Sequence, residues 1–178
     1  MAKDIDKVLI GAGSIFEIGA YVTAKGAGTL AELGHLLEGV RFKATVEHKL
    51  IEPDAHLAAG RAVPIKREYT VQVKGIEATP ELLRIALGQP AANLTGTPPN
   101  MTLNVDPDAV EQYHQLRWVE PGLGTTKVRT VTAWKAYLKE VPEIVASKGD
   151  IKEVNFTFGL LYEETGTGTD DVVRLVET

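Results

Sequence analysis

Two alternating segments in the first half of the chain constrain its fold more than any other feature. Segment 41–51 reads RFKATVEHKLI, with charged residues alternating with apolar or less polar ones, and segment 65–75, IKREYTVQVKG, alternates around Tyr69, Val71 and Val73. Successive side chains of a strand point to opposite faces, so a period of two predicts half-buried antiparallel strands. The two strands most simply pair with each other as a hairpin.

The connection between these strands is unusually long. Segment 52–64, EPDAHLAAGRAVP, far exceeds the two to five residues that usually close a hairpin. Long loops in compact domains usually carry function. The segment and its leading edge also mix apolar and polar side chains, as partner surfaces do. We therefore expect the main functional site of the chain here.

A single helix is well marked in the sequence. Segment 78–90, ATPELLRIALGQP, has Thr79 as N-cap, Pro80 in the first turn and Gly88 as C-cap. The helix should pack on a sheet or a neighbour through its apolar stripe, which consists of Leu82, Leu83, Ala86 and Leu87.

Most of the remaining chain favours strands. We expect strands near 113–119, 127–139 and 154–162, although VTAWKAYLKEV (131–141) could also form a helix. Segment 91–112 is rich in Thr, Pro, Asn and Asp and is expected to be a loop with one short strand near 101–105. The chain is sized for one domain, residues 1–164, and residues 165–178 should form a flexible tail that ends in a possible short strand.

A glycine-rich stretch near the start resembles a dinucleotide-binding loop only in part. In KVLIGAGSIFEIGAYV (7–22), Gly11 and Gly13 fit the G-x-G-x-x-G motif, but Phe16 occupies the position of the third glycine. The residues that follow alternate with a period of two, which suits a strand and not the helix that receives a phosphate. We therefore interpret Gly11, Gly13 and Gly19 as positions of bends or close backbone contacts.

No catalytic or metal-binding pattern emerges from the sequence. The histidines, at positions 35, 48, 56 and 114, lack zinc-site spacing, neither serine lies in G-x-S-x-G, and the chain has no cysteine. His48 lies on the apolar face of its strand, which favours a core or interface histidine. Trp118 and Trp134 are expected to be core or subunit-contact anchors. We therefore expect no enzyme, no cofactor and no metal.

Charge and hydropathy limit the possible partners. A net charge of −5 argues against a protein that wraps nucleic acid, but it suits a surface that nucleic acid must slide past. The start of the chain lacks the pattern of a signal peptide, and no apolar run approaches the roughly 20 residues of a membrane span. We expect the protein to be made, or assembled, in a cytoplasm.

The order of these features resembles the tail tube proteins of long-tailed bacteriophages. The resemblance covers Val8 to Glu164 and is one of pattern and order. The successive segments that carry it are VLIGAGSIFEIG, LGHLLEGVRFKATVEHKLIE, the long loop, PIKREYTVQV, EATPELLRIALG and VRTVTAWKAYLKEVPEIVASKGDIKEVNFTFGLLYEE. Residues 91–108 and the tail after Glu164 do not match the family pattern.

The resemblance implies a mainly β subunit, a β-sandwich or barrel with one flanking helix and long loops. Such subunits form hexameric rings that stack into a tube with other tail proteins (tape measure, terminator and tip), located in the virion and conducting DNA without membrane insertion. The long loop would contact the adjacent ring, with candidate residues Ile51, Pro53, Asp54, His56, Leu57 and Arg61. Two alternatives remain: a monomeric β-sandwich binding or adhesion module with a Trp118 or Trp134 platform, and a nucleotide-dependent enzyme built on IGAGS.

Overall fold

Antiparallel strands dominate the computed structural model of the chain. It describes residues 8–9, 15–25, 28–33, 36–51, 61–75, 79–110, 112–121, 128–140, 154–162 and 171–178. The helical elements are η1 (Thr23–Lys25), α1 (Pro80–Ala86) and η2 (Ala91–Asn93). The strands are β1 (Val8–Leu9), β2 (Ile15–Ala20), β3 (Leu30–Glu32), β4 (Leu36–Ile51), β5 (Arg61–Gly75), β6 (Leu94–Thr97), β7 (Asn100–Leu103), β8 (His114–Pro121), β9 (Val128–Glu140), β10 (Val154–Leu161) and β11 (Val173–Glu177).

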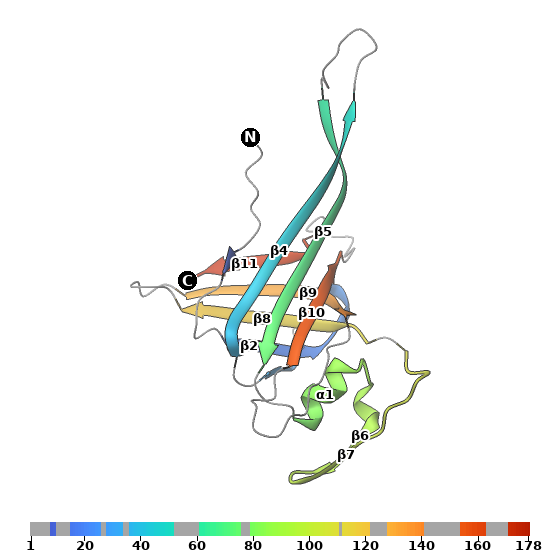
Figure 1. The fold of residues 1–178 in the computed structure, drawn as a ribbon. Coiled ribbons are helices and arrows are strands. Elements are labelled where there is room, and N and C mark those ends of the chain that lie inside the picture. Colours follow the sequence, from blue (N-terminus) through green and yellow to red (C-terminus); the bar gives the residue numbers. More distant parts are fainter. Residues whose placement is uncertain are drawn as a thin grey trace.

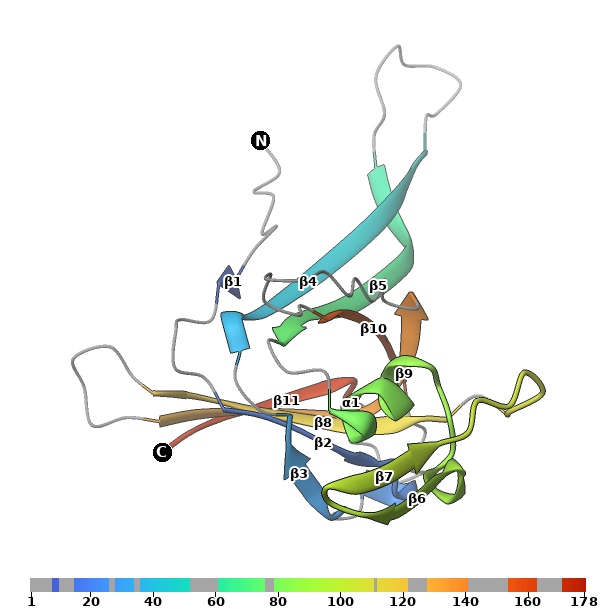
Figure 2. The same ribbon diagram turned by 60° about the horizontal axis from the view of Figure 1, so that its bottom comes forward.

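The main sheet bends at β9 to form two layers. Its strand order is β1-β4-β5-β10-β9-β8-β2-β3, and β11 also pairs with β9. One edge of β9 is shared, because β11 pairs with residues 129–133 and β10 pairs with residues 135–140. As a result, β4, β5 and β10 cross over the layer that contains β2, β8 and β11 (Figures 1 and 2). The mainly β, sandwich-like prediction is confirmed, and the described strands do not close into a barrel.

The core lies between these two layers. The ring of Phe16 stacks on that of Trp118 with centroids 6.4 Å apart and on that of Phe158 at 6.5 Å. Phe156 stacks on Phe158 at 5.9 Å. Aromatic rings supply a large buried apolar area, and stacked pairs add about 0.5–1.5 kcal/mol each. Trp118 is thus a core anchor, as expected, and offers no exposed platform for a sugar.

The predicted strands are largely confirmed. Val71 and Val73 of β5 are buried and Tyr69 is half-buried, while the described aromatic face of β10 contributes Phe156 and Phe158 to the core. β4 and β5 pair as the expected hairpin. Segment 131–140 is strand and not helix. The end of the tail forms β11, which pairs with β9 in the main sheet.

The predicted helix is present and ends as expected at Gly88. The Gly88 backbone has φ of +63°, its N–H donates to the carbonyl of Ile85 over 3.0 Å, and the Gln89 N–H donates to that of Arg84 over 2.9 Å. This pair of bonds is a Schellman C-cap. Of the described side chains in and just after α1, that of Ile85 is buried in the core, whereas those of Leu83 and Leu87 are half-buried. The side chains of Leu82 and Ala86 lie outside the described set.

The segment after α1 forms more structure than the sequence predicts. β6 and β7 pair as a separate two-stranded hairpin, so the expectation of one short strand missed β6. The buried side chain of Gln89 joins α1 to this hairpin: its Nε2 donates to the carbonyls of Leu87 and Asp106, and its Oε1 accepts from Asn93 Nδ2 and the Asp106 N–H. All four hydrogen-bonding positions of the amide are used.

The residues that follow the glycine-rich start form β2, and not the helix of a dinucleotide site. Phe16 and Ile18 face the core. A Cβ at Gly19 would lie 2.3 Å from the backbone oxygen of Thr29, so the expected close backbone contact is confirmed there. Gly11 and Gly13 lie outside the described residues.

Candidate assembly surfaces

The distal part of the β4–β5 hairpin projects from the sandwich as an arm, which we define as residues 45–51 and 61–67 (Figure 1). β1 pairs with β4 only at Arg41 and Phe42, and β10 pairs with β5 only from Tyr69 to Gly75. Among the described residues, the arm strands therefore pair with each other alone, up to Ile51 opposite Arg61. No other described strand lies along the two outer edges, which leaves their backbone N–H and C=O groups for pairing with another strand.

One face of the arm is the continuation of the face of β4 that contacts the core, but on the arm this face is exposed to solvent. Phe42 and Ala44 are half-buried under the sandwich, whereas Val46 and Leu50, next in the alternation, are 41% and 59% exposed. Ile65, at the register shift opposite Glu47 and His48, is 62% exposed. Fully burying one such side chain is worth about 1.5–3 kcal/mol. The exposed His48 lies between Val46 and Leu50 on this face, so the arm presents mixed apolar and polar side chains, as partner surfaces do.

The opposite face of the arm carries a row of ion pairs. Lys66 Nζ lies 3.9 Å from Glu47 Oε1 and 3.6 Å from Glu68 Oε2, and Lys139 of β9 donates to Glu68. The Lys139 hydrogen bond lowers the pKa of Glu68 and raises that of Lys139. These groups are solvent-exposed, so the pairs add little stability and serve mainly to orient the base of the arm.

An apolar groove opens at the base of the arm, where the two layers separate. Its cavity volume is about 760 Å³, and its apolar lining includes Phe42, Tyr69, Trp118, Val131 and Leu175. Asp171 also lines it and forms an ion pair with Lys25, and this hydrogen bond lowers the pKa of Asp171. Arg67, the last residue of the arm, also lines the groove, so the groove lies next to the arm.

The sequence-predicted contact residues fall partly on the arm. Ile51 and Arg61 face each other at its last described pair, and Ile51 is exposed. Pro53, Asp54, His56 and Leu57 lie outside the described residues, so their role stays a prediction. His48 is exposed on the arm, so the core alternative for this histidine is wrong and the interface alternative remains.

Val46, Leu50 and Ile65 were missed as site residues by reasoning from the sequence. The signal for Val46 and Leu50 was present, because both lie on the apolar face of the alternating segment 41–51. Alternation shows that a face is apolar but not whether the same chain or another molecule covers it. The half-buried interpretation of this strand is therefore correct as far as Ala44 and wrong for the arm.

The described residues show no arrangement typical of metal chemistry. No group of three or more His, Asp or Glu side chains within the described ranges is placed to hold a metal ion. Asp106 and Asp108 lie in a turn, with the Asp108 N–H donating to Asp106 Oδ1 over 3.0 Å. No helix within the described ranges has the length and apolarity of a membrane span.

Comparisons with known proteins leave the family of this chain open. No family model matches the sequence, and no curated protein matches it. Among solved structures, a chain of the anti-feeding prophage baseplate, determined by cryo-EM with six-fold symmetrisation, is similar over 91% of this chain and 92% of that chain. The TM-score is 0.44 and the sequence identity 9%. The superposition is too loose for that structure to assign a fold family or an activity to this chain.

Proposed function

We propose that this chain is a structural subunit of a bacteriophage tail tube, in which six copies form a ring and the rings stack into a hollow tube. In this proposal the protein catalyses no reaction, and its activity is assembly. The observation that carries the proposal is the arm, a two-stranded ribbon with an apolar face exposed to solvent. The order of sequence segments that resembles tail tube proteins supports the same role.

The arm explains why a lone copy of this chain is incomplete. A two-stranded ribbon is at best marginally stable in water without a third strand or a covering surface. Here the side chains of Val46, Leu50 and Ile65 are exposed in the single chain. A second copy that packs on this face would remove apolar area from water and would satisfy the strand edges, which otherwise invite aggregation.

The remaining features fit a tube subunit. Among the described strands, the sheet ends in β3 on one side and β11 pairs with β9 alone, so both strands offer edges for pairing with neighbours around a ring. A net charge of −5 disfavours the phosphate contacts that would retain DNA in a lumen. The proposed location is the virion tail, where the tape measure, terminator and tip proteins would be further partners.

Substitutions on the apolar face of the arm test the proposal. The double variant Val46→Asp/Leu50→Asp places two carboxylates on the arm and leaves the core residues unchanged. We expect wild-type protein to form rings or filaments by negative-stain electron microscopy and the double variant to sediment as a monomer that still unfolds in one cooperative transition.

Val110→Asp is the matched control, because Val110 is 78% exposed and lies outside the arm. It should assemble as wild type does. Wild-type protein that stays monomeric over a wide concentration range would count against the tube, and assembly of the double variant would place the contact elsewhere.

A further inference from the structure

The groove at the base of the arm has large apolar side chains that are exposed to solvent. Tyr162 is 53% exposed and Leu175 is 61% exposed, and both line the groove. The rings of Phe42 and Tyr69, stacked with centroids 6.2 Å apart, form another part of its wall. Exposed apolar side chains that gather on a concave surface favour a partner that covers them.

The arm of the same copy cannot cover this groove. Phe42 of β4 and Tyr69 of β5 belong to the groove wall, and beyond them the two strands stay paired with each other as far as Ile51 and Arg61. Figure 1 shows this paired ribbon leading away from the sandwich. Because its base forms the wall, the arm does not fold back into the groove beside it. An arm that enters the groove therefore comes from a second copy.

Charge favours contact between the arm and the body of another copy over contact between two arms. The arm has one carboxylate, that of Glu47, and four basic side chains, which are Lys49, Arg61, Lys66 and Arg67. The whole chain has a net charge of −5, so the rest of the chain is more acidic than the whole. Two arms placed face to face would repel each other, whereas an arm is attracted to the body of another copy. Asp171, which already pairs with Lys25, adds a carboxylate to the groove lining.

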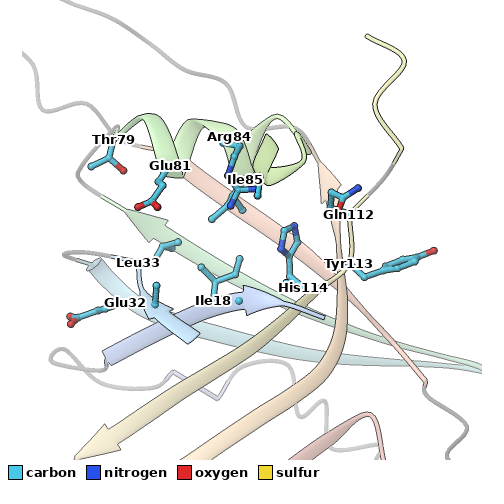
Figure 3. Close-up of a pocket in the computed structure, with 14 residues that line it drawn as sticks. Ile18, Glu32, Leu33, Thr79, Glu81, Arg84, Ile85, Gln112, Tyr113 and His114 are labelled. Carbon is cyan, nitrogen blue, oxygen red and sulfur yellow. The ribbon is translucent and has the colours of Figure 1, made fainter. Parts of the chain in front are cut away.

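A second cavity with apolar walls is less suited to receive the arm. It lies between α1 and the sheet, and its volume of about 330 Å³ is less than half that of the groove (Figure 3). Its apolar walls are formed by Ile18, Leu33 and Ile85, which are at most 7% exposed and belong to the core. An arm placed there would remove little further apolar area from water.

We propose that the groove of one copy receives the apolar face of the arm of a second copy. In this contact, Val46, Leu50 and Ile65 of the arm lie against the groove lining. The inference rests on the proposed function and names the surface that the arm contacts. The contact joins two different surfaces, so it continues from copy to copy into rings or filaments, unless two copies exchange arms and close as a dimer.

Leu175→Asp tests the groove side of the contact. Leu175 is mostly exposed, so the variant should still unfold in one cooperative transition, but its carboxylate would be buried under the incoming arm. We expect it to lose rings and filaments, as Val46→Asp/Leu50→Asp does. Val176→Asp is the matched control, because Val176 is the next residue of β11, is exposed and lies outside the groove lining. The control should assemble as wild type does, and assembly of Leu175→Asp would overturn the proposal.

Cysteine cross-linking identifies the two surfaces that meet. The chain has no cysteine, so each introduced thiol is unique. Leu50→Cys copies are mixed with Leu175→Cys copies that carry a mass tag, at a concentration at which wild type assembles. Under mild oxidation we expect a disulfide between the two kinds of copy. Val110→Cys copies, with the thiol at an exposed position outside the arm and the groove, replace the Leu50→Cys copies as the control and should give none.

The outcomes separate this contact from the tube itself. A polymer in which the Leu50→Cys and Leu175→Cys copies do not cross-link, or in which Leu50→Cys copies cross-link only with each other, would overturn the groove contact and leave the tube. A closed dimer that contains the expected disulfide would support the groove contact and contradict the tube. Wild-type protein that is monomeric at every concentration would contradict both.

Discussion

Three residues that lie in or against the core are polar or small, and hydrophobic periodicity does not predict the roles of His114 and Gln89. His114 and Gln89 are both buried, but all four hydrogen-bonding positions of the Gln89 amide are used, whereas His114 Nε2 has no partner among the described residues. Gly19 allows the backbone of Thr29 to approach closely. The sequence predicted a close contact at Gly19, because a glycine within an alternating segment is a local signal.

Stability should fall as pH falls from about 6.5 to about 4, partly because of His114. Burial lowers the folded-state pKa of His114 to about 4 from 6.5, so in this range the unfolded chain binds more protons than the folded one. The contribution is present in full above pH 6.5 and is lost toward pH 4, on the order of 3 kcal/mol. Urea unfolding of wild type and His114→Phe at several pH values measures it.

His48→Gln is the control for this experiment, because His48 is exposed. It should retain the wild-type pH dependence, whereas His114→Phe should show a flatter profile between pH 4 and 6.5. Identical profiles for wild type and His114→Phe would mean that His114 is not the titrating group.

Replacing Gln89 should loosen the junction between α1 and the β6–β7 hairpin. Gln89→Leu leaves the Asp106 N–H and the Asn93 amide without their acceptor, which should cost on the order of 3 kcal/mol in unfolding free energy. Gln89→Glu keeps an acceptor but cannot donate to the Leu87 and Asp106 carbonyls, so it should also destabilise. A change below about 0.5 kcal/mol in both variants, the range of ordinary surface substitutions, would contradict this assignment.

At the level of elements, the sequence predicts the strands and the helix better than their arrangement. Alternation identified β4, β5 and β10, and capping residues identified α1, because these signals are local. The division of one β9 edge between β10 and β11 depends on pairing between distant segments. Reasoning from the sequence missed β6, because Gly96, with φ of +91°, and the neighbouring prolines are residue types typical of loops.

The arm should be dispensable for folding but required for assembly. Glu47 pairs with Lys66, so residues 48–65 can be replaced by Asn-Gly, which favours the tight hairpin turn that such a pair requires. The core residues all lie outside this segment. We expect a single cooperative thermal transition and no polymer by sedimentation velocity. A shortened protein that still polymerises would exclude the arm as the essential contact.

At the scale of the whole molecule, two exposed apolar features lie next to each other: the arm and the groove at its base. From the sequence, the long connection could be predicted as a contact site, but the projection of the two strands from the sandwich could not, because it depends on where β1 and β10 stop pairing. The groove was also missed, since its lining comes from segments distant in sequence.

The most direct test of assembly as the function is cryo-EM of the purified full-length protein. The account predicts six-fold rings stacked into a tube, with Val46, Leu50 and Ile65 covered by a neighbouring copy. A monomer at every concentration, or a polymer in which these three side chains stay exposed to solvent, would contradict it.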